Sequence, residues 1–420
     1  MSTDRVLFLL ARPPIPQDTG AKIRSWNILR GFAERYEVDV LSYSEPGTAL
    51  DGGSKNVQSW AEAAKEVGVR RVEEVPNESL VHPTSAPHFV AAVLQGLPVS
   101  VMKYRRRVFS GAFRKMLSQG YELLHVETLH LAGELKALKG KDRPFVTLNA
   151  HNVECQIADR MCEIEPSPLR RTALSLHARN MRRFEREAFA ASDAVLAVSR
   201  EDCRQIDALC DVAGRAFLVE NGVDDSYFMP GEFSEENPDE VVFVGSMDWL
   251  PNIDGVVRFA EDILPRIRER RPATHLTVVG RRPHPEILAL HAPDRGVTVT
   301  GTVDDVRPYV RRAGVVAVPL RFGGGTRLKI LEAFSMSKAV VSTSLGCEGI
   351  LCRDGDHLMV RDDAESFARA CLEIMEDPQC RKKLGIKGRE LALARYAWPS
   401  VIERMHAEID RRRNGVGHGF

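Results

Sequence analysis

A glycine-rich turn between an apolar strand and a helix is the segment of this sequence best suited to bind an anion. The apolar run 315–318 ends shortly before Gly323, Gly324 and Gly325, and Thr326 leads into a segment of helical periodicity. Glycines allow backbone N–H groups to converge, and the N-terminus of a helix adds unpaired donors and a partial positive charge. The order of strand, glycine turn and helix therefore predicts a site that could hold a diphosphate.

Two basic residues near the start of this helix support the same prediction. Arg327 and Lys329 lie where the helix dipole disfavours cations unless an anion is present to pair with them. The alternative is an ordinary turn, in which Lys329 and Glu332 form an i,i+3 pair worth only ~0.2–0.5 kcal/mol. The pattern alone leaves both open. It lacks G-x-x-x-x-G-K-[ST] and the third glycine of a dinucleotide fingerprint, which excludes the P-loop ATPase, kinase and ordinary dehydrogenase classes.

A second polar group follows another predicted strand. Residues 145–148 form an apolar run, and His151 and Glu154 come directly after it. Parallel sheets bind ligands at the carboxyl ends of their strands, so these two residues are candidates for catalysis or sugar binding. The alternative is a structural histidine and a glutamate that charges the first turn of a helix.

The composition indicates a globular protein with two domains. The 420 residues exceed one ordinary core, and 44% of them are hydrophobic. The 58 basic residues equal the 58 acidic ones, so the chain lacks the positive field of a nucleic-acid binder and we expect no nucleic acid partner. The eight cysteines show no zinc spacing, and we find no convincing Asp-x-Asp motif, so we expect no metal. The apolar run at residues 6–11 is too short for a secretion signal, so we expect a cytoplasmic protein.

Short apolar runs alternate with helical segments in two successive series. Runs at 6–10, 38–41, 123–126, 145–148 and 194–198 form the first, and runs at 241–244, 276–279, 297–299, 315–318 and 340–342 form the second. This alternation predicts strands and crossover helices around parallel sheets. Two tandem Rossmann-like, doubly wound α/β domains with a cleft between them explain both series.

Turn signals place the join between the domains near residues 219–230. Asn221-Gly222 and Pro230-Gly231 are such signals, and an acidic stretch follows them. We therefore expect domains at residues 1–219 and 220–398. A charge-rich amphipathic helix in the segment 399–420 is expected to pack back on the first domain.

The glycine-rich segment resembles the donor-binding segment of the retaining glycosyltransferases of family 4, which have the GT-B fold. The resemblance is carried by Gly-Gly-Thr-Arg-Leu-Lys-Ile-Leu-Glu-Ala-Phe, starting at Gly324, and by Lys-Ala-Val-Val-Ser-Thr, starting at Lys338. Asn-Gly-Val-Asp at 221–224 and Phe-Val-Gly-Ser-Met-Asp-Trp at 243–249 are also similar to the family, so the resemblance covers about residues 5–405. Residues 13–24 resemble a bacterial branch associated with exopolysaccharide and exosortase loci.

The resemblance implies a role for each candidate site residue. Glu332 would hydrogen-bond the donor ribose, while Lys329 and the amides of residues 323–326 would hold the diphosphate. Gly245 and Ser246 would pass close to the same phosphates, and Gly20 lies in a loop that would approach the donor. His151 would touch the transferred sugar. The implied catalytic residues are His151, Lys329 and Glu332, and the implied donor-binding domain is the second one.

The sequence departs from the family pattern at two places. Many members have a glutamate that contacts the donor sugar where this chain has Gly324, which leaves the sugar open. Many also have an arginine and a lysine near the positions of Ser246 and Asn252. More of the diphosphate charge would then fall on Arg327 and Lys329.

A basic segment of the first domain is the candidate for the acceptor side. Residues 103–115 contain six basic residues and no acidic one, which predicts either a membrane-surface patch or a solvated helix face. The predicted acceptor-side residues are Arg24, Glu154, Arg105 and Arg106. The predicted acceptor is a glycan or a polyprenyl diphosphate-linked molecule, met in peripheral contact with the cytoplasmic face of the inner membrane.

The resemblance implies a metal-independent, retaining hexosyltransferase that acts in exopolysaccharide or other cell-surface glycan synthesis. A nucleotide diphosphate sugar would be its co-substrate, with no further cofactor. Two alternatives remain: a nucleotide-sugar epimerase on a similar two-domain fold, and a non-catalytic protein that binds sugar nucleotides.

Overall fold

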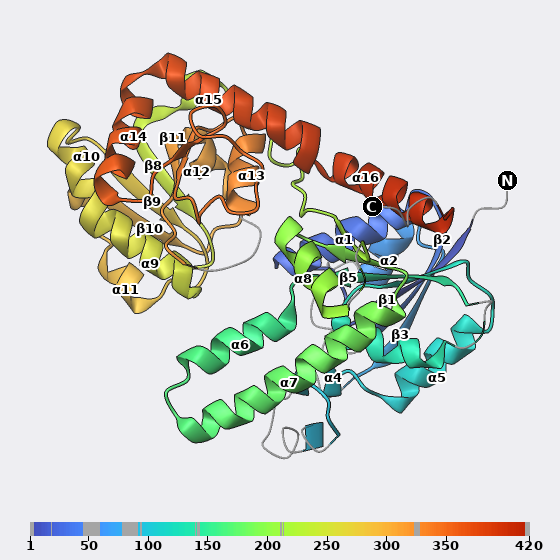
Figure 1. The fold of residues 1–420 in the computed structure, drawn as a ribbon. Helices are drawn as coiled ribbons and strands as arrows, with labels where there is room; N and C mark the ends of the chain where they lie inside the picture. Colours follow the sequence, from blue (N-terminus) through green and yellow to red (C-terminus); the bar gives the residue numbers. More distant parts are fainter. Residues whose placement is uncertain are drawn as a thin grey trace. The chain divides into compact units, whose positions relative to one another are not determined.

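The computed structural model describes residues 4–17, 19–44, 59–77, 91–92, 95–138, 140, 143–210, 212, 214–322 and 328–415 (Figure 1). Its internal contacts divide the chain into two compact units, each with its own sheet. Unit 1 comprises Met1–Glu220 and Ile402–Phe420, and unit 2 comprises Asn221–Val401.

Unit 1 is built on a parallel sheet of seven described strands in the order β3-β2-β1-β4-β5-β6-β7. Central strands are continuous apolar runs because both faces of the sheet are covered. Successive residues of β1 show this: Leu9 belongs to a core with Phe109 and Phe184, whereas the ring of Phe8 lies 5.7 Å from the ring of Phe32. The strands are β1 Arg5–Leu10, β2 Glu37–Ser44, β3 Arg71–Pro76, β4 Leu123–Val126, β5 Phe145–Ala150, β6 Ala194–Ala197 and β7 Ala216–Leu218.

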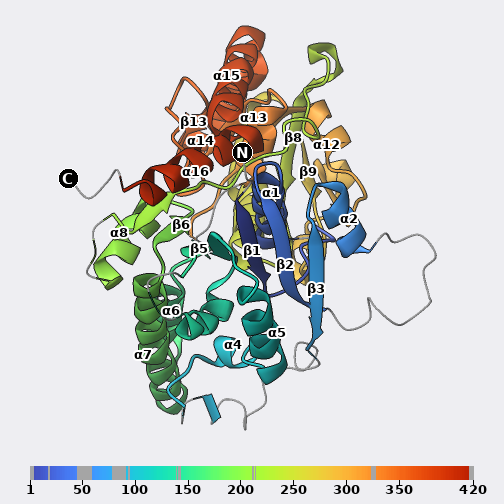
Figure 2. The same cartoon turned by 90° about the vertical axis from the view of Figure 1, so that its right-hand side faces the viewer.

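The described helices of unit 1 surround this sheet, and α5 packs against β2 and β3 (Figure 2). No helix in the described part of the chain combines the length and apolar character needed to span a membrane. The helices are α1 Gly20–Ala33, α2 Trp60–Glu66, α4 Val99–Met102, α5 Arg107–Leu117, the 3₁₀ helix Leu129–Ala137, α6 Glu154–Ile164, α7 Pro168–Ala191 and α8 Arg200–Cys210.

The last helix, α16 (Trp398–Arg413), contributes its residues from Ile402 onward to unit 1. His406 Nε2 donates to the Gly31 carbonyl of α1 at 2.8 Å, and Arg35 pairs with Asp410 at 2.6 Å. A Cβ added at Gly31 would lie 2.5 Å from a methyl carbon of Ile402. Glycine therefore allows α1 and this end of α16 to approach closely.

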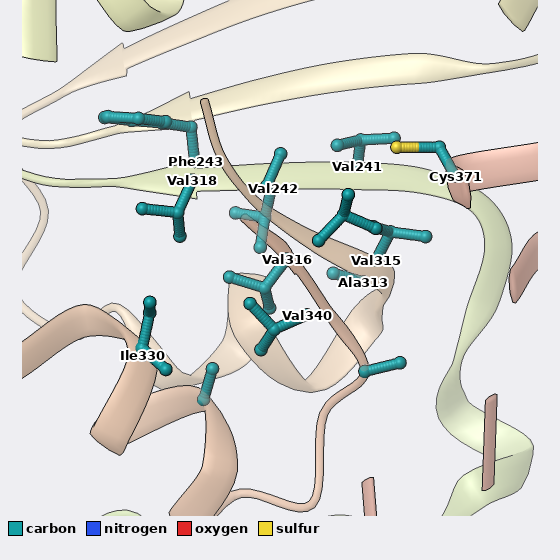
Figure 3. Close-up of a cluster of buried hydrophobic side chains, with 14 of the residues drawn as sticks. Val241, Val242, Phe243, Ala313, Val315, Val316, Val318, Ile330, Val340 and Cys371 are labelled. Atoms are coloured by element: carbon teal, nitrogen blue, oxygen red, sulfur yellow. The ribbon is translucent and has the colours of Figure 1, made fainter. Parts of the chain in front are cut away.

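Unit 2 is built on a second parallel sheet, with six described strands in the order β10-β9-β8-β11-β12-β13. Figure 3 shows its centre, where Val241 and Phe243 of β8 lie among Val315, Val318 and other buried side chains. The strands are β8 Asn237–Val244, β9 His275–Val279, β10 Val297–Gly301, β11 Ala313–Val318, β12 Val340–Ser342 and β13 Met359–Val360.

The helices of unit 2 include two π-helical turns that continue longer helices, Phe259–Ile263 after α9 and Ala392–Tyr396 after α15. Two 3₁₀ helices, Phe233–Glu235 and Pro293–Arg295, lie in connections. The α-helices are α9 Leu250–Arg258, α10 Leu264–Arg270, α11 Pro285–Ala289, α12 Arg307–Arg312, α13 Leu328–Ser335, α14 Ala364–Glu376 and α15 Pro378–Leu391.

The two Rossmann-like sheets confirm the predicted fold class, and each of the ten predicted strands is present. The apolar runs did not predict β3, β7 and β13. All three lie at the edges of their sheets, and β7 and β13 contain only three and two residues. Only one of the six residues of β3 is buried, and its sequence, Arg-Val-Glu-Glu-Val-Pro, lacks the apolar run of a buried strand.

We predict that Gly31→Ala destabilises unit 1, because the added methyl group meets the buried Ile402 side chain. Overpacking of this kind costs about 1–3 kcal/mol. Gly111→Ala on α5 is the matched control, since its added Cβ meets no atom within 4 Å. There, alanine should stabilise the helix by ~0.4–1 kcal/mol. Urea unfolding of both variants measures the difference, and equal effects at the two glycines would contradict the packing of α16 on α1.

Candidate functional site

Polar residues at the carboxyl ends of β4 and β5 form a buried hydrogen-bonded network around Glu127. The register pairs Val126 with Leu148, so the residues that follow these strands leave the sheet side by side. Glu127 is fully buried, and its Oε1 accepts hydrogen bonds from Ser25 Oγ at 2.7 Å and Asn149 Nδ2 at 2.8 Å. A carboxylate that accepts several donors is stabilised in its charged form.

Two histidines complete the environment of this carboxylate. His125 Nε2 lies 2.8 Å from Glu127 Oε2, and His151 Nε2 lies 3.2 Å from Oε1. Burial alone would raise the pKa of Glu127, but the hydrogen bonds from His125 and His151 lower it well below its usual range. His125 Nδ1 is held in turn by Thr147 Oγ1 at 2.8 Å. The carboxylate is therefore charged at neutral pH and fixes the position of both rings.

Arg24 extends the network from α1 to residues 219 and 220, where the first segment of unit 1 ends. Its Nε and Nη2 donate to Asn149 Oδ1 at 3.1 and 2.9 Å, and its Nη1 donates to the carbonyls of Val219 (2.8 Å) and Glu220 (3.2 Å). Burial lowers the pKa of Arg24 to about 10, with Glu127 opposing the shift, so the group stays charged at neutral pH. Arg24 is 1% exposed. We therefore describe this predicted acceptor-side residue as a positioning residue beneath the surface.

A cavity of about 400 Å³ lies next to this network, and His151 and Glu154 both line it. The His151 side chain is 18% exposed. Its Nε2 faces Glu127, whereas its Nδ1 has no hydrogen-bond partner among the described residues. Gly20 opens α1 between Thr19 and Ala21, and these two neighbours also line the cavity. Lys22, Tyr104 and His130 are among the other lining residues.

Glu154 is held at the start of α6 by a carboxylate from α7. Glu185 accepts from the backbone N–H groups of Glu154 at 2.6 Å and Cys155 at 3.0 Å. Burial raises the pKa of Glu185 to about 7, although these hydrogen bonds oppose the shift. Burial also raises the pKa of Glu154, while His151 lowers it in part. Arg105 and Arg106, the remaining predicted acceptor-side residues, line a different cavity of unit 1.

In unit 2, Lys329 of α13 meets the turn that follows β8. Lys329 Nζ donates to Asn252 Oδ1 at 2.9 Å and lies 4.1 Å from the ring centroid of Phe243. Asn252 Nδ2 donates to the Ser246 carbonyl at 2.8 Å. A Cβ added at Gly245 would lie 2.7 Å from Asn252 Nδ2 and 3.0 Å from Lys329 Nζ. Glycine at this position therefore lets the lysine lie close to the backbone at the end of β8.

A second close approach brings the end of β9 to the same turn. A Cβ added at Gly280 would lie 1.6 Å from the Gly245 carbonyl oxygen. Arg281, the next residue, donates from Nε to Ser246 Oγ at 3.2 Å, and Ser246 Oγ donates to Asp248 Oδ1 at 2.6 Å. The structure thus brings the predicted residues Gly245, Ser246 and Lys329 together.

Glu332 lies one helical turn beyond Lys329 and is only partly buried. Its desolvation raises its pKa to about 7, and Lys329 lowers it in part. Within the described chain no hydrogen bond or ion pair holds its carboxylate. Carboxyl groups whose pKa is shifted and whose oxygens have no protein partner are typical of ligand-binding positions. Gly323, Gly324, Gly325, Thr326 and Arg327 lie outside the described residues, so the predicted glycine turn stays a prediction.

Several residues of these sites were not predicted from the sequence: His125, Glu127 and Glu185 in unit 1, and Arg281 in unit 2. Glu127 follows β4 and Arg281 follows β9, which is the same signal that identified His151, whereas His125 lies within β4 one residue before its end. Glu185 lies within a long helix and acts across space, which its sequence position does not reveal. No group of three His, Cys, Asp or Glu side chains suited to hold a metal ion occurs in the described ranges.

We predict that Glu332→Gln stabilises the protein above about pH 7 and has no effect below about pH 4.5. The folded protein must bury the Glu332 carboxylate at high pH, a cost of at most about 3 kcal/mol, but binds a proton instead as the pH falls. Urea unfolding across this pH range measures the difference. The exposed Glu261→Gln is the control and should show no such pH dependence. A constant difference at all pH values would contradict the raised pKa of Glu332.

Family models match both units of the chain. A model described as glycosyltransferase family 4 matches residues 19–227, and one described as glycosyl transferases group 1 matches residues 238–377. Together they cover most of the chain. Among solved structures, Anabaena Alr3699/HepE in complex with UDP and glucose superimposes with a TM-score of 0.63 at 14% identity, covering 97% of this chain and 99% of that one. This likeness concerns the fold.

Two curated proteins of Mycolicibacterium smegmatis are similar in sequence. Phosphatidyl-myo-inositol mannosyltransferase is 29% identical over 210 residues, which cover 48% of this chain and 53% of that protein. This chain thus spans about half the length of that relative. GDP-mannose-dependent alpha-(1-6)-phosphatidylinositol monomannoside mannosyltransferase is 26% identical over 304 residues, covering 68% of this chain and 74% of that protein. With a matching family model on each Rossmann-like unit, the chain belongs to glycosyltransferase family 4.

Proposed function

We propose that this protein is a retaining glycosyltransferase that moves a hexose from a nucleotide diphosphate sugar onto a cell-surface glycan or its lipid-linked precursor. The observation that carries the proposal is the position of Lys329, which contacts Asn252 and lies beside Gly245 after β8, with Glu332 one helical turn further along α13. This arrangement offers a cation for a diphosphate and, for hydroxyl groups, a carboxylate with no hydrogen-bond partner among the described residues. The two mannosyltransferase relatives and the UDP complex of the structural neighbour support a donor of this class.

Lys329 is suited to stabilise the charge of a departing diphosphate. Asn252 orients its ammonium group, and the Phe243 ring covers part of it, which limits competition from water. The desolvated carboxylate of Glu332 would gain hydrogen bonds when ribose hydroxyls arrive. We propose that these protein groups, with Arg327, balance the diphosphate charge without a divalent cation.

The proposed reaction breaks the bond between the anomeric carbon of the sugar and the donor diphosphate. A new bond forms between that carbon and an acceptor hydroxyl oxygen, and the hydroxyl proton passes to the leaving diphosphate. His151 would hydrogen-bond the transferred sugar through Nδ1, because its Nε2 is directed to Glu127. We propose a cytoplasmic location with peripheral contact at the inner membrane and a role in exopolysaccharide synthesis.

We predict that one of UDP, GDP or ADP raises the melting temperature in the presence of EDTA. At a hundredfold excess over Kd, the stabilisation is about 2.7 kcal/mol, or roughly 5–10 °C for a domain of this size. Lys329→Ala should abolish the shift, because it removes the cation beside the diphosphate. Lys383→Ala, an exposed lysine on α15, is the control and should retain it.

Four results would contradict parts of this proposal. A shift that survives Lys329→Ala would place the nucleotide elsewhere. Stabilisation without donor hydrolysis or transfer would indicate a non-catalytic binding protein, and isomerised donor in the absence of an acceptor would indicate an epimerase. Loss of the shift in EDTA would replace the metal-free proposal by a metal-dependent one.

We also predict that Glu127→Gln lowers the rate of donor hydrolysis by about 100-fold while nucleotide binding is unchanged. The amide removes the charge that holds His151 and His125, and a small displacement of a reacting group has an effect of this size. Glu127→Asp keeps the charge and should recover part of the rate. The exposed Glu163→Gln on α6 is the control. Equal rates for Glu127→Gln and the control would exclude a positioning role for the network.

A further inference from the structure

Four arginines line one cavity of unit 1 at the N-terminus of α5. The cavity has a volume of about 650 Å³, and Arg105, Arg106, Arg107 and Arg114 are four of its seven lining residues. Arg105, Arg107 and Arg114 are exposed, and Arg106 is partly buried. We call this site the arginine cavity.

The described residues provide no ion-paired carboxylate for the arginine cavity. Arg105 Nη1 donates to the uncharged Gln95 side chain at 3.2 Å, and no ion pair involves any of the four arginines in the described chain. Glu134 is the acidic residue nearby, but it accepts a hydrogen bond from Ser110 Oγ at 2.7 Å instead. Burial raises the pKa of Glu134, with Arg114 and Arg105 opposing the shift in part.

Several other arginines of unit 1 form ion pairs with an aspartate. Arg143 contacts Asp193 through two hydrogen bonds of 2.7 Å, and Arg70 and Arg182 pair with Asp39 and Asp159. Four guanidinium groups without an ion pair among the described residues repel one another, and this repulsion falls when an oxyanion binds between them.

The start of α5 adds to the positive potential. Arg106 occupies the N-cap position without a side-chain hydrogen bond, and the first turn contains no acidic residue. A helix usually places acidic or capping side chains here, because its N-terminal N–H groups carry partial positive charge. Both the helix end and the arginines therefore favour the same kind of ligand.

Within unit 1, a third cavity adjoins both the arginine cavity and the cavity lined by His151. A neighbouring cavity of about 770 Å³ shares Arg105, Ser110 and Arg114 with the arginine cavity, and it shares Tyr104 and His130 with the cavity of His151. The side chains between include Leu97, Val101, Leu131 and Phe184, which are apolar. This series of neighbouring cavities suits a ligand with an anionic end and a less polar middle part.

We propose that the arginine cavity binds a phosphate or diphosphate group of the acceptor, so that an acceptor lying along the neighbouring cavities directs a hydroxyl toward His151. Planar guanidinium groups bind phosphate oxygens in pairs, which lysines do not. The phosphate-binding site stands on the geometry of unit 1, whereas its use by an acceptor rests on the proposed function. A soluble glycan phosphate and a lipid headgroup share this chemistry.

Hydrogen–deuterium exchange of the full chain with pyrophosphate as the probe tests the site. We expect the amides of residues 105–117 to become protected. In Arg107→Gln/Arg114→Gln the pyrophosphate concentration for half-maximal protection should rise at least about tenfold, because charge-assisted hydrogen bonds are lost. Lys65→Gln/Lys115→Gln removes the same charge from exposed positions outside the arginine cavity, one of them on α5, and should leave the concentration unchanged.

Vesicles distinguish the two sources of phosphate. Protection by pyrophosphate in solution supports a soluble phosphate group, and protection only by phosphatidic acid vesicles supports a lipid headgroup. Equal protection by phosphate-free fatty acid vesicles of the same charge would overturn the proposal, as would the absence of protection with every probe. Protection that persists in Arg107→Gln/Arg114→Gln would overturn it too.

The same experiment separates this inference from the donor site. Nucleoside diphosphate should protect residues 245–252 and 328–335, which belong to unit 2. Protection of 105–117 by pyrophosphate without any nucleotide effect in unit 2 would leave the phosphate site standing and contradict the proposed donor binding. The reverse result would contradict only the arginine cavity.

Discussion

The buried carboxylate of Glu127 imposes a condition that much of unit 1 must meet. A charge with no access to water needs hydrogen-bond donors, and these come from α1, from β4 and from the end of β5. Asn149 also accepts hydrogen bonds from Arg24, and the guanidinium of Arg24 donates to the carbonyls of residues 219 and 220. One ionised group thus fixes the relative positions of a helix, two strand ends and the last residues of the first segment of unit 1.

The Glu332 carboxylate of unit 2 has the opposite environment. Glu332 is desolvated but receives no donor from the described chain, so part of the stability of unit 2 is given up at neutral pH. Lys329 is held ready by Asn252 and Phe243. The contrast separates two functions of buried charge: the Glu127 network organises a site from within the protein, whereas Glu332 and Lys329 are arranged for groups that come from outside it.

The sequence predicted the parts of this protein that obey periodicity. The ten apolar runs correspond to strands, because parallel strands inside a sheet are buried on both faces. β3 was not predicted, because its position at the edge of the sheet permits the charged residues Glu73 and Glu74. The sequence also indicated Lys329, Glu332 and His151. It did not indicate that Asn252 would orient Lys329 across 77 positions, or that Glu185 would hold the start of α6 from 30 positions away, since such contacts depend on how elements pack. The glycine turn at 323–327 remains known from the sequence alone.

The last turns of α16 have a consequence for the order of events on the ribosome. Unit 1 begins the chain, yet the α16 residues that contact Gly31 and Arg35 are synthesised only after all of unit 2. During synthesis, this surface of α1 therefore stays uncovered until the chain is almost complete. Unit 2 is one continuous segment, so all its residues are synthesised before the last part of unit 1. A chain that stops after residue 401 would contain all of unit 2 but would lack the part of α16 that packs on unit 1.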